Sequence, residues 1–596
     1  MNLIAELKRR NVLRATLLYA GAVWAFGQGL SQFSPALGLP DMTTRWFLIA
    51  AAIGFPFWIA FAWFYEFTPQ GLKRESEVAA DASIERSTGR RLDKWIVAVL
   101  AIAVVLLLAN TFIWHTGRGD PRDTGSAENI PQKSVAVLPL ENEGGDKDQQ
   151  YFSDGLSETL ITALSQFSGL KVISRDSAFR FRHSTESSAT IGEKLGVAHL
   201  LEGSVRRIGG TVRINATLVL AADGSTVWSQ HYDRPYKDLF KLQDEITDAV
   251  ANALKARLIE NGDAKPQTDR PPGGSLEAYN AYLQGQFHAA RNNEPDLRTA
   301  IAHYQDAVRL DPGYAAAYAA LGSTQLVLAV NYLPSTESRP MYAQSQRSID
   351  AALRLAPSLA WAHAAKALLL AARDLDWRGA HTEYRRAFEL APNNPRVMYA
   401  YANDLATFGQ VSSGVDLIRQ ALRIDPFDGH MYFGLSRLFA ALGRMDEAQA
   451  TADKAVRLQP DSDTYRMMQN YIAVLRGDFR TANMIARSIR PGVWHDFTSA
   501  LALQGGADRG AADAALAIMI DRHADASAYQ IAEIYALRGD PDETFHWLER
   551  AWANHDPGLQ SLLFDAFILR YKDDPRFAAF CRKVGLPTTT EAKAMP

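Results

Sequence analysis

The chain has 596 residues, of which 22% are charged and 47% are hydrophobic, and its formal net charge is −3. This length exceeds what one core can hold and predicts several domains, while the near-neutral charge argues against a nucleic-acid-binding protein, which normally has a basic excess. Because Cys581 is the single cysteine, the chain can form neither an intrachain disulfide nor a thiol-based metal cluster.

Three apolar stretches near the amino terminus predict a membrane anchor in residues 1–115. They occupy about residues 15–37, 46–65 and 95–114. Each has about the twenty residues needed to cross the hydrocarbon layer as a helix. Trp95 and Trp114 stand at the two ends of the third stretch, where indole rings prefer the membrane interface. The sequence therefore predicts three transmembrane helices.

Lysine and arginine counts in the flanks of these stretches predict their orientation. Basic residues precede the first stretch, the short turn after it has none, and six more lie between the second and third, from Lys73 to Lys94. Basic flanks favour the cytoplasmic side. We therefore expect a bacterial inner-membrane protein with a cytoplasmic amino terminus and with residues after about 115 in the periplasm.

A linker at residues 116–132, rich in Gly, Asp, Pro and Ser, leads into a mixed α/β domain at 133–259. Two alternating runs, 200–207 and 211–219, are joined at Gly209 and Gly210, which is a hairpin signal. Apolar residues at helical spacing predict helices at 154–167 and 239–258. Ser153 or Asp154 is expected to cap the first of these helices.

Five sequence blocks of this domain resemble the domain similar to the amino-terminal domain of TolB. They are SVAVLPLEN, YFSDGLSETLITALS, KVISRDSAFRF, LGVAHLLEGSVRRIGGTVRINATLV and GSTVWSQHYDR. The resemblance implies a module that accompanies tetratricopeptide repeats in bacteria, in some chains beside an adenylate cyclase domain or a winged-helix regulator domain. The first 115 residues, with ELKRRNV and WFYEFTPQGLKRE, resemble the anchor of a group of proteobacterial repeat proteins.

A second linker at 260–275 precedes a repeat array at 276–586, and residues 587–596 form a tail. Five prolines stand 45, 35, 34 and 34 residues apart, each with an alanine five positions earlier and an aliphatic residue two positions earlier: Pro312, Pro357, Pro392, Pro426 and Pro460. A period near 34 is typical of stacked helix pairs, since proline ends a helix and a small side chain lets two helices approach closely. The array is predicted to be an all-α solenoid.

The array resembles tetratricopeptide repeats, for example in Tyr432, Leu435, Gly443, Ala455 and Pro460. Turn glycines at 409, 443, 477, about 506 and 539 continue the period, so we expect about eight units and a carboxy-terminal cap. The second unit has about eleven extra residues around 331–340, which should bulge from one surface of the solenoid.

Two first helices of the array present candidate binding residues opposite their packing stripe. The spacing i, i+3, i+7 places these side chains on one face of each helix. By the resemblance, first helices line the concave groove where such arrays bind peptides, and aromatic and arginine side chains are suitable anchors. The predicted groove residues are Arg396, Tyr399, Asn403, His430, Phe433 and Arg437.

No catalytic, cofactor-binding or metal-binding motif is found in the sequence, since His-Glu-x-x-His, Cys-x-x-Cys, P-loop and Gly-x-Ser-x-Gly patterns are missing. We therefore expect a non-enzymatic scaffold, anchored in the inner membrane, that binds a protein or peptide partner. The alternative is a signal-transduction or sensor protein that accompanies an adenylate cyclase or a transcriptional regulator. An enzyme is the least favoured class.

Overall fold

The computed structural model describes residues 130–144, 149–255, 257–258, 269–333 and 335–594, together with 65–68, 71–74 and positions 16, 19, 23, 47, 51, 54, 55 and 58. The chain divides into two compact units, Met1–Glu128 and Asn129–Pro596. In the first unit, strands β1 (Tyr65–Thr68) and β2 (Gly71–Arg74) form an antiparallel hairpin. The Tyr19 hydroxyl donates a hydrogen bond to the carbonyl oxygen of Ala51 at 2.8 Å.

The structure corrects the expected membrane anchor. Within the part of the chain that the structure describes, no helix combines the length and the apolar character that a bilayer crossing requires. The longest of these helices, α12 (Ser335–Leu355, 21 residues), carries five charged side chains, which are costly in hydrocarbon. The fold class with three transmembrane helices and the inner-membrane and periplasmic location are therefore wrong. The predicted stretch 95–114 lies wholly, and 15–37 and 46–65 mostly, outside the described residues.

The second unit begins with a mixed sheet in the order β6-β3-β7-β8-β9, with β4 beside β7. Strand β3 pairs in parallel with β6 and β7, whereas β7, β8 and β9 form an antiparallel meander. The strands are β3 (Ser134–Val137), β4 (Glu141–Asn142), β6 (Lys171–Val172), β7 (His199–Ile208), β8 (Thr211–Leu220) and β9 (Thr226–Pro235). The short strands β5 (Phe167–Ser168) and β10 (Arg257–Leu258) pair separately.

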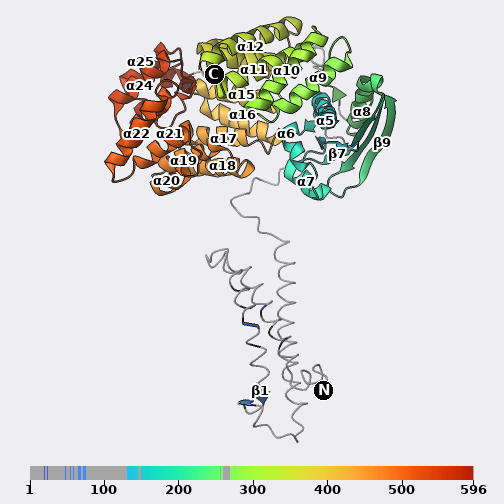
Figure 1. Cartoon of the computed structure of the whole chain (residues 1–596), viewed down its shortest axis with the longest axis horizontal. Coiled ribbons are helices and arrows are strands. Elements are labelled where there is room, and N and C mark those ends of the chain that lie inside the picture. The colour runs from blue at the N-terminus through green and yellow to red at the C-terminus, as the bar shows by residue number, and fades with distance from the viewer. Residues whose placement is uncertain are drawn as a thin grey trace. The chain divides into compact units, whose positions relative to one another are not determined.

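Helices cover both faces of this sheet (Figure 1). Helices α5 (Gln150–Leu164) and α8 (Leu239–Ala253) pack their apolar stripes on one face, while α6 (Arg175–Ala178) and α7 (Ser188–Leu195) cover the other. Helix α5 begins before Ser153 and Asp154, so neither residue caps it. Asp154 instead accepts a hydrogen bond from Arg182 at 2.6 Å, which accounts for a buried carboxylate inside a helix.

An all-α solenoid follows, in which the described residues form eight consecutive helix pairs and a cap. The pairs are α9 (Leu276–Ala289) with α10 (Glu294–Leu310), α11 (Ala315–Asn331) with α12, α13 (Ala360–Leu369) with α14 (Trp377–Leu390), α15 (Pro395–Thr407) with α16 (Val411–Ile424), α17 (Gly429–Ala441) with α18 (Met445–Leu458), α19 (Asp463–Leu475) with α20 (Phe479–Ala486), α21 (Val493–Leu503) with α22 (Arg509–His523), and α23 (Ala528–Arg538) with α24 (Pro541–Ala553). The cap contains η6 (Pro557–Ser561), η7 (Ile568–Tyr571), α25 (Pro575–Lys583) and α26 (Thr589–Ala594).

The repeated residues explain the pairing. Each of the five spaced prolines lies two positions after the last residue of a second helix, because proline cannot continue the hydrogen-bonded backbone. The alanines five positions before them are at most 1% exposed, so the helices approach closely there: Ala307, Ala352, Ala387, Ala421 and Ala455. The extra residues of the second unit form the first turns of α12 instead of a loop, with Pro340 inside the helix.

The carboxy-terminal cap folds back on the middle of the array. The Trp377 indole N–H, on α14, donates a hydrogen bond to the carbonyl oxygen of Val584 at 3.0 Å, across 207 positions of the sequence. Cys581 is fully buried in the same region, and burial raises the pKa of its thiol to about 12. The thiol is therefore a packing group and not a reactive one.

Candidate partner-binding face

Four of the six predicted groove residues, Tyr399, His430, Phe433 and Arg437, lie together in the structure with a fifth side chain, Tyr465 of α19. The Tyr399 and His430 rings lie 5.0 Å apart, His430 and Phe433 are stacked at 5.8 Å, and Phe433 and Tyr465 are stacked at 5.8 Å. Arg437 lies over Phe433 at 5.7 Å. We call these four rings, Tyr399, His430, Phe433 and Tyr465, the aromatic row.

Close packing of first helices holds the aromatic row together. A Cβ atom at Gly434 of α17 would lie 2.6 Å from the Tyr399 ring of α15, so a side chain there would collide. Only glycine allows this approach. Phe433 and Tyr465 are 8% and 7% exposed, whereas His430, between Tyr399 and Phe433, is exposed, so the row reaches the surface at His430.

Arg396 lies one turn before Tyr399 on α15 and is already paired within the chain. Its guanidinium donates to the Asp176 carboxylate of α6 at 2.7 Å. Arg396 holds the pKa of Asp176 below its usual value, and Asp176 raises the pKa of Arg396. Beside them, Glu158 of α5 lies 3.0 Å from Arg175, although burial still raises the pKa of Glu158. The predicted anchor thus belongs to a network of alternating charges.

Arg437, which lies over Phe433, contacts the carboxy-terminal cap. Its guanidinium donates to the Ser561 hydroxyl at 2.5 Å and lies 4.8 Å from the centre of the Phe564 ring. Behind it, Glu533 of α23 and Asp565 are 5% and 6% exposed and share a hydrogen bond. Burial and the Asp565 carboxylate raise the pKa of Glu533 well above its usual value. A protonated Glu533 can donate to Asp565, which makes this buried pair tolerable.

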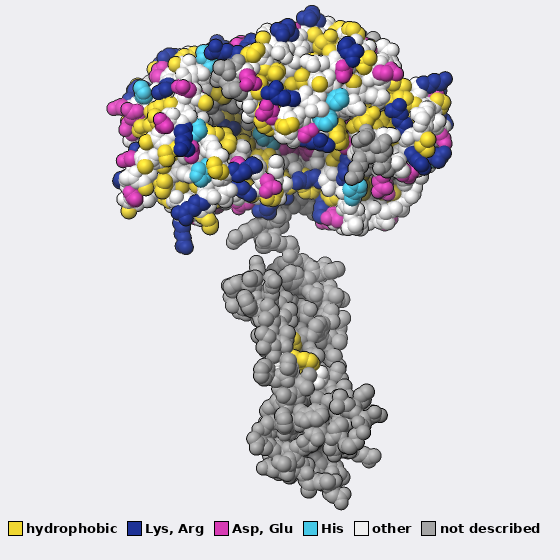
Figure 2. Space-filling view, viewed as in Figure 1, with side chains coloured by type: hydrophobic (Ala, Val, Ile, Leu, Met, Phe, Trp, Pro, Cys, Tyr) yellow, Lys and Arg dark blue, Asp and Glu magenta, His cyan; other side chains and the backbone are white. Residues whose placement is uncertain are grey.

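Asn403 does not take part in this arrangement. Its side-chain amide donates to the carbonyl oxygen of Tyr399 at 2.8 Å, within its own helix. Sequence reasoning missed Asp176, Ser561 and Asp565, because each reaches the face from a distant part of the chain. Figure 2 shows this unit hollowed near the middle of the face, with cationic and acidic side chains at the edges of the recess.

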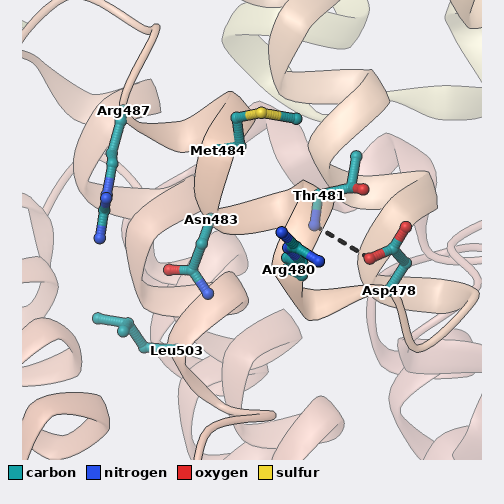
Figure 3. Close-up of a pocket in the computed structure, with 7 residues that line it drawn as sticks. All are labelled: Asp478, Arg480, Thr481, Asn483, Met484, Arg487 and Leu503. Carbon is teal, nitrogen blue, oxygen red and sulfur yellow. Dashed lines mark hydrogen bonds between the residues drawn. The ribbon is translucent and has the colours of Figure 1, made fainter.

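A separate shallow pocket lies between α20 and α21. It is lined by Asp478, Arg480, Thr481, Asn483, Met484, Arg487 and Leu503 (Figure 3). Asp478 accepts a hydrogen bond from the Thr481 backbone N–H at 3.0 Å and so caps α20. Arg480 and Arg487 lie on opposite sides of Asn483. The one carboxylate of the pocket serves the backbone, so these seven residues offer no pair of groups for acid–base chemistry.

Repeated helix pairs, proline-ended second helices and buried small residues define a tetratricopeptide-repeat solenoid. A tetratricopeptide-repeat family model matches residues 429–462, the pair α17 and α18. A second model, for the second domain of HilA/YgeH-like transcriptional regulators, matches residues 131–249. This stretch contains the sheet and its helices. The resemblance to the amino-terminal domain of TolB stays a prediction.

Two curated relatives match parts of the chain. A protein named "Putative adenylate cyclase 3" from Rhizobium meliloti (strain 1021) is 37% identical over 205 residues, which is 34% of this chain and 34% of that protein. The small glutamine-rich tetratricopeptide repeat-containing protein 2 of Mycosarcoma maydis is 32% identical over 91 residues, 15% of this chain and 26% of that protein. The matched stretches thus span about a third or less of each relative.

Solved helical-repeat structures also align with the chain. The structure of pilF from Pseudomonas aeruginosa is 17% identical, with a TM-score of 0.27, and the match covers 34% of this chain and 90% of that one. Yeast Tom70 is 15% identical, with a TM-score of 0.32, and the match covers 52% of this chain and 68% of that one.

Proposed function

We propose that this tetratricopeptide-repeat protein is a non-enzymatic scaffold that binds a protein or peptide partner across α15 and α17. The observation that carries the proposal is the aromatic row together with Arg437 over Phe433 and with Arg396 one turn before Tyr399 on α15. Preformed aromatic surface offers contact area at little entropic cost, and arginine adds directional hydrogen bonds. The tetratricopeptide match at 429–462 supports a protein-binding role for α17.

Site-specific photo-crosslinking tests this face. A benzoylphenylalanine at the exposed position His430 should capture a partner in cells that express the full chain. The same group at Val227, which is 44% exposed on β9, is the matched control. The partner should then bind the purified chain, and Phe433→Leu, which removes the ring but keeps an apolar side chain, should weaken binding about tenfold or more. Equal capture from both positions would contradict the proposed face.

A second function is favoured by two further matches. The model of a transcriptional regulator's second domain and the relative named as an adenylate cyclase both point to signalling proteins. In this alternative the chain accompanies a cyclase or regulator and alters its activity. To test this, the purified chain is mixed with an adenylate cyclase from the same cell, and the rate of cyclic AMP formation is measured. The chain alone should form none, and an unchanged rate in the mixture would exclude this alternative.

A further inference from the structure

The sheet-containing part contacts the solenoid at two places that lie far apart in the sequence. Helix α5 packs on α9, where the Thr159 and Tyr279 hydroxyl groups lie 2.7 Å apart and Gly155 allows Leu283 to approach closely. Tyr279 is fully buried and Leu283 is 2% exposed. Helix α6 reaches the array again at the end of α16, about 250 positions later (Figure 1). The first contact is a packed core, and the second is built differently.

The second contact consists mainly of hydrogen bonds from one short segment, which we call the α6 segment and which spans Ser174 to Phe181. The backbone N–H of Ser174 donates to the carbonyl oxygen of Ile424 at 3.1 Å. The Ser177 hydroxyl accepts from the backbone N–H of Phe427 at 2.9 Å and donates to the Asp425 carboxylate. These groups therefore join the segment to the loop between α16 and α17, which leads directly into the aromatic row.

The same segment supplies the carboxylate that Arg396 holds. Asp176 and Arg396 lie 2.7 Å apart, yet their side chains are 38% and 53% exposed. An ion pair with this much exposure contributes about 1 kcal/mol or less to stability, because water screens it. Arg180 adds a hydrogen bond to the carbonyl oxygen of Leu458 at 2.6 Å. The ion pair is therefore the exposed part of a contact whose other part is buried, since Ser177 and Asp425 are 0% and 1% exposed and Phe427 packs on Phe181 with ring centres 5.9 Å apart.

We infer that Asp176 of the α6 segment is a built-in occupant of Arg396, and that a partner places its own carboxylate on Arg396 in place of Asp176. This inference rests on the proposed function and names the partner's chemistry, an acidic side chain beside an apolar or aromatic one. Guanidinium groups bind carboxylates in a directional, charge-assisted manner, so the site that holds Asp176 is preformed for another acid. Binding is then coupled to release of Asp176 and to faster opening of the α6 contact around it, while the packed α5–α9 contact stays closed.

Hydrogen–deuterium exchange of the full chain tests the release. The backbone N–H groups of Ser174 and Phe427 both donate across the contact, so their exchange reports its opening. Asp176→Asn should speed exchange at both about threefold to fivefold, the size expected for a half-exposed ion pair. Asp233→Asn is the matched control, since Asp233 pairs with Arg213 at 2.7 Å with similar exposure but within the sheet. Equal exchange in the two variants would overturn the inference.

A peptide in trans tests the preference for an acid. The probe has the sequence of residues 174–181, and its control carries Asn in place of the aspartate. Added in excess to the Asp176→Asn chain, the aspartate peptide should slow exchange at Phe427, and the control peptide should not. Protection by both peptides, or by neither, would overturn the acid preference. If the crosslinked partner binds the wild type and Asp176→Asn equally well, Asp176 does not occupy the partner's place on Arg396, while the proposed function stands.

Discussion

The two arginines beside the aromatic row, Arg396 and Arg437, are held by other parts of the chain in different ways. Arg396 forms an ion pair with Asp176, and the two side chains are 53% and 38% exposed. Arg437 contacts the cap, which packs on the array: Phe567 is fully buried and its ring lies 4.6 Å from that of Tyr471. Arg396 is thus held by screened charge, whereas the cap beside Arg437 is held by a hydrophobic core.

This difference indicates which contact can open during function. Apolar burial is lost only when a whole segment unfolds, whereas a half-exposed ion pair exchanges partners at small cost. The cap is therefore expected to be a permanent part of the solenoid, and the Asp176–Arg396 pair an exchangeable contact. Mutations at the two sites should then differ in the size of their effects and in the dependence of those effects on pH and salt.

The largest effect is expected at the cap. Phe567→Ala removes a fully buried ring that packs on Tyr471, and the cavity should cost about 3 to 5 kcal/mol of unfolding free energy. Urea unfolding followed by circular dichroism measures this change. Met484→Ala is the control, because Met484 is 66% exposed and its loss should change stability by about 0.5 kcal/mol or less. A similar small loss in both variants would show that the cap is not a core element.

The buried acid behind Arg437 should make stability fall as pH rises. Glu533 has a raised pKa in the folded chain, so the folded state holds a proton that the unfolded chain releases near its ordinary value of about 4.3. Its stabilising contribution is complete below that value and is lost as pH rises toward the raised one. Glu533→Gln should remove this loss, so the unfolding free energy of the variant should fall less than that of the wild type as pH rises from about 5 to about 8. Parallel curves of unfolding free energy against pH for wild type and variant would contradict the raised pKa of Glu533.

Asp425, in the contact with the α6 segment, should also make stability fall as pH rises, but by less than Glu533. Burial raises its pKa to about 6, and it is 1% exposed. The wild type should therefore lose stability between about pH 4 and pH 6, and Asp425→Asn should lose less, by about 1 to 2 kcal/mol. The amide oxygen can still accept the hydrogen bond from Ser177, so the contact remains. Thermal unfolding at pH 4, 5, 6 and 7 separates this window from that of Glu533.

The repeat period could be predicted because it depends on local rules. Proline ends each second helix wherever it stands, and Gly409, Gly443, Gly477 and Gly539 adopt the left-handed backbone that a tight turn requires. Gly506 does not, since the turn after α21 has another shape. Local rules also placed Tyr399, His430 and Phe433 on one face. They could not show what lies against that face.

Contacts between distant segments explain both the incomplete site and one error in the sheet-containing part. Asp176 and Arg396 are 220 positions apart, and Arg437 and Ser561 are 124 apart, so no periodicity connects them. Ser153 and Asp154 looked like helix caps, but α5 begins earlier and Asp154 pairs with Arg182, 28 positions later. The membrane anchor was expected from hydropathy, flanking basic residues and a resemblance, and the described helices do not support it.

The smallest effect on stability is expected at Arg396. It also separates the Arg396 contact most sharply from the cap contact of Arg437. Arg396→Gln should lower the unfolding free energy by about 1 kcal/mol or less at low salt, because its side chain is 53% exposed, and the difference should vanish near 1 M NaCl as screening removes the attraction to Asp176. Arg213→Gln breaks a similarly exposed pair inside the sheet and should match it in stability without opening Ser174. A loss above about 3 kcal/mol that persists in high salt would mean that Arg396, like the cap residues, is fixed in place. The α6 segment could not then leave the face without unfolding part of the array.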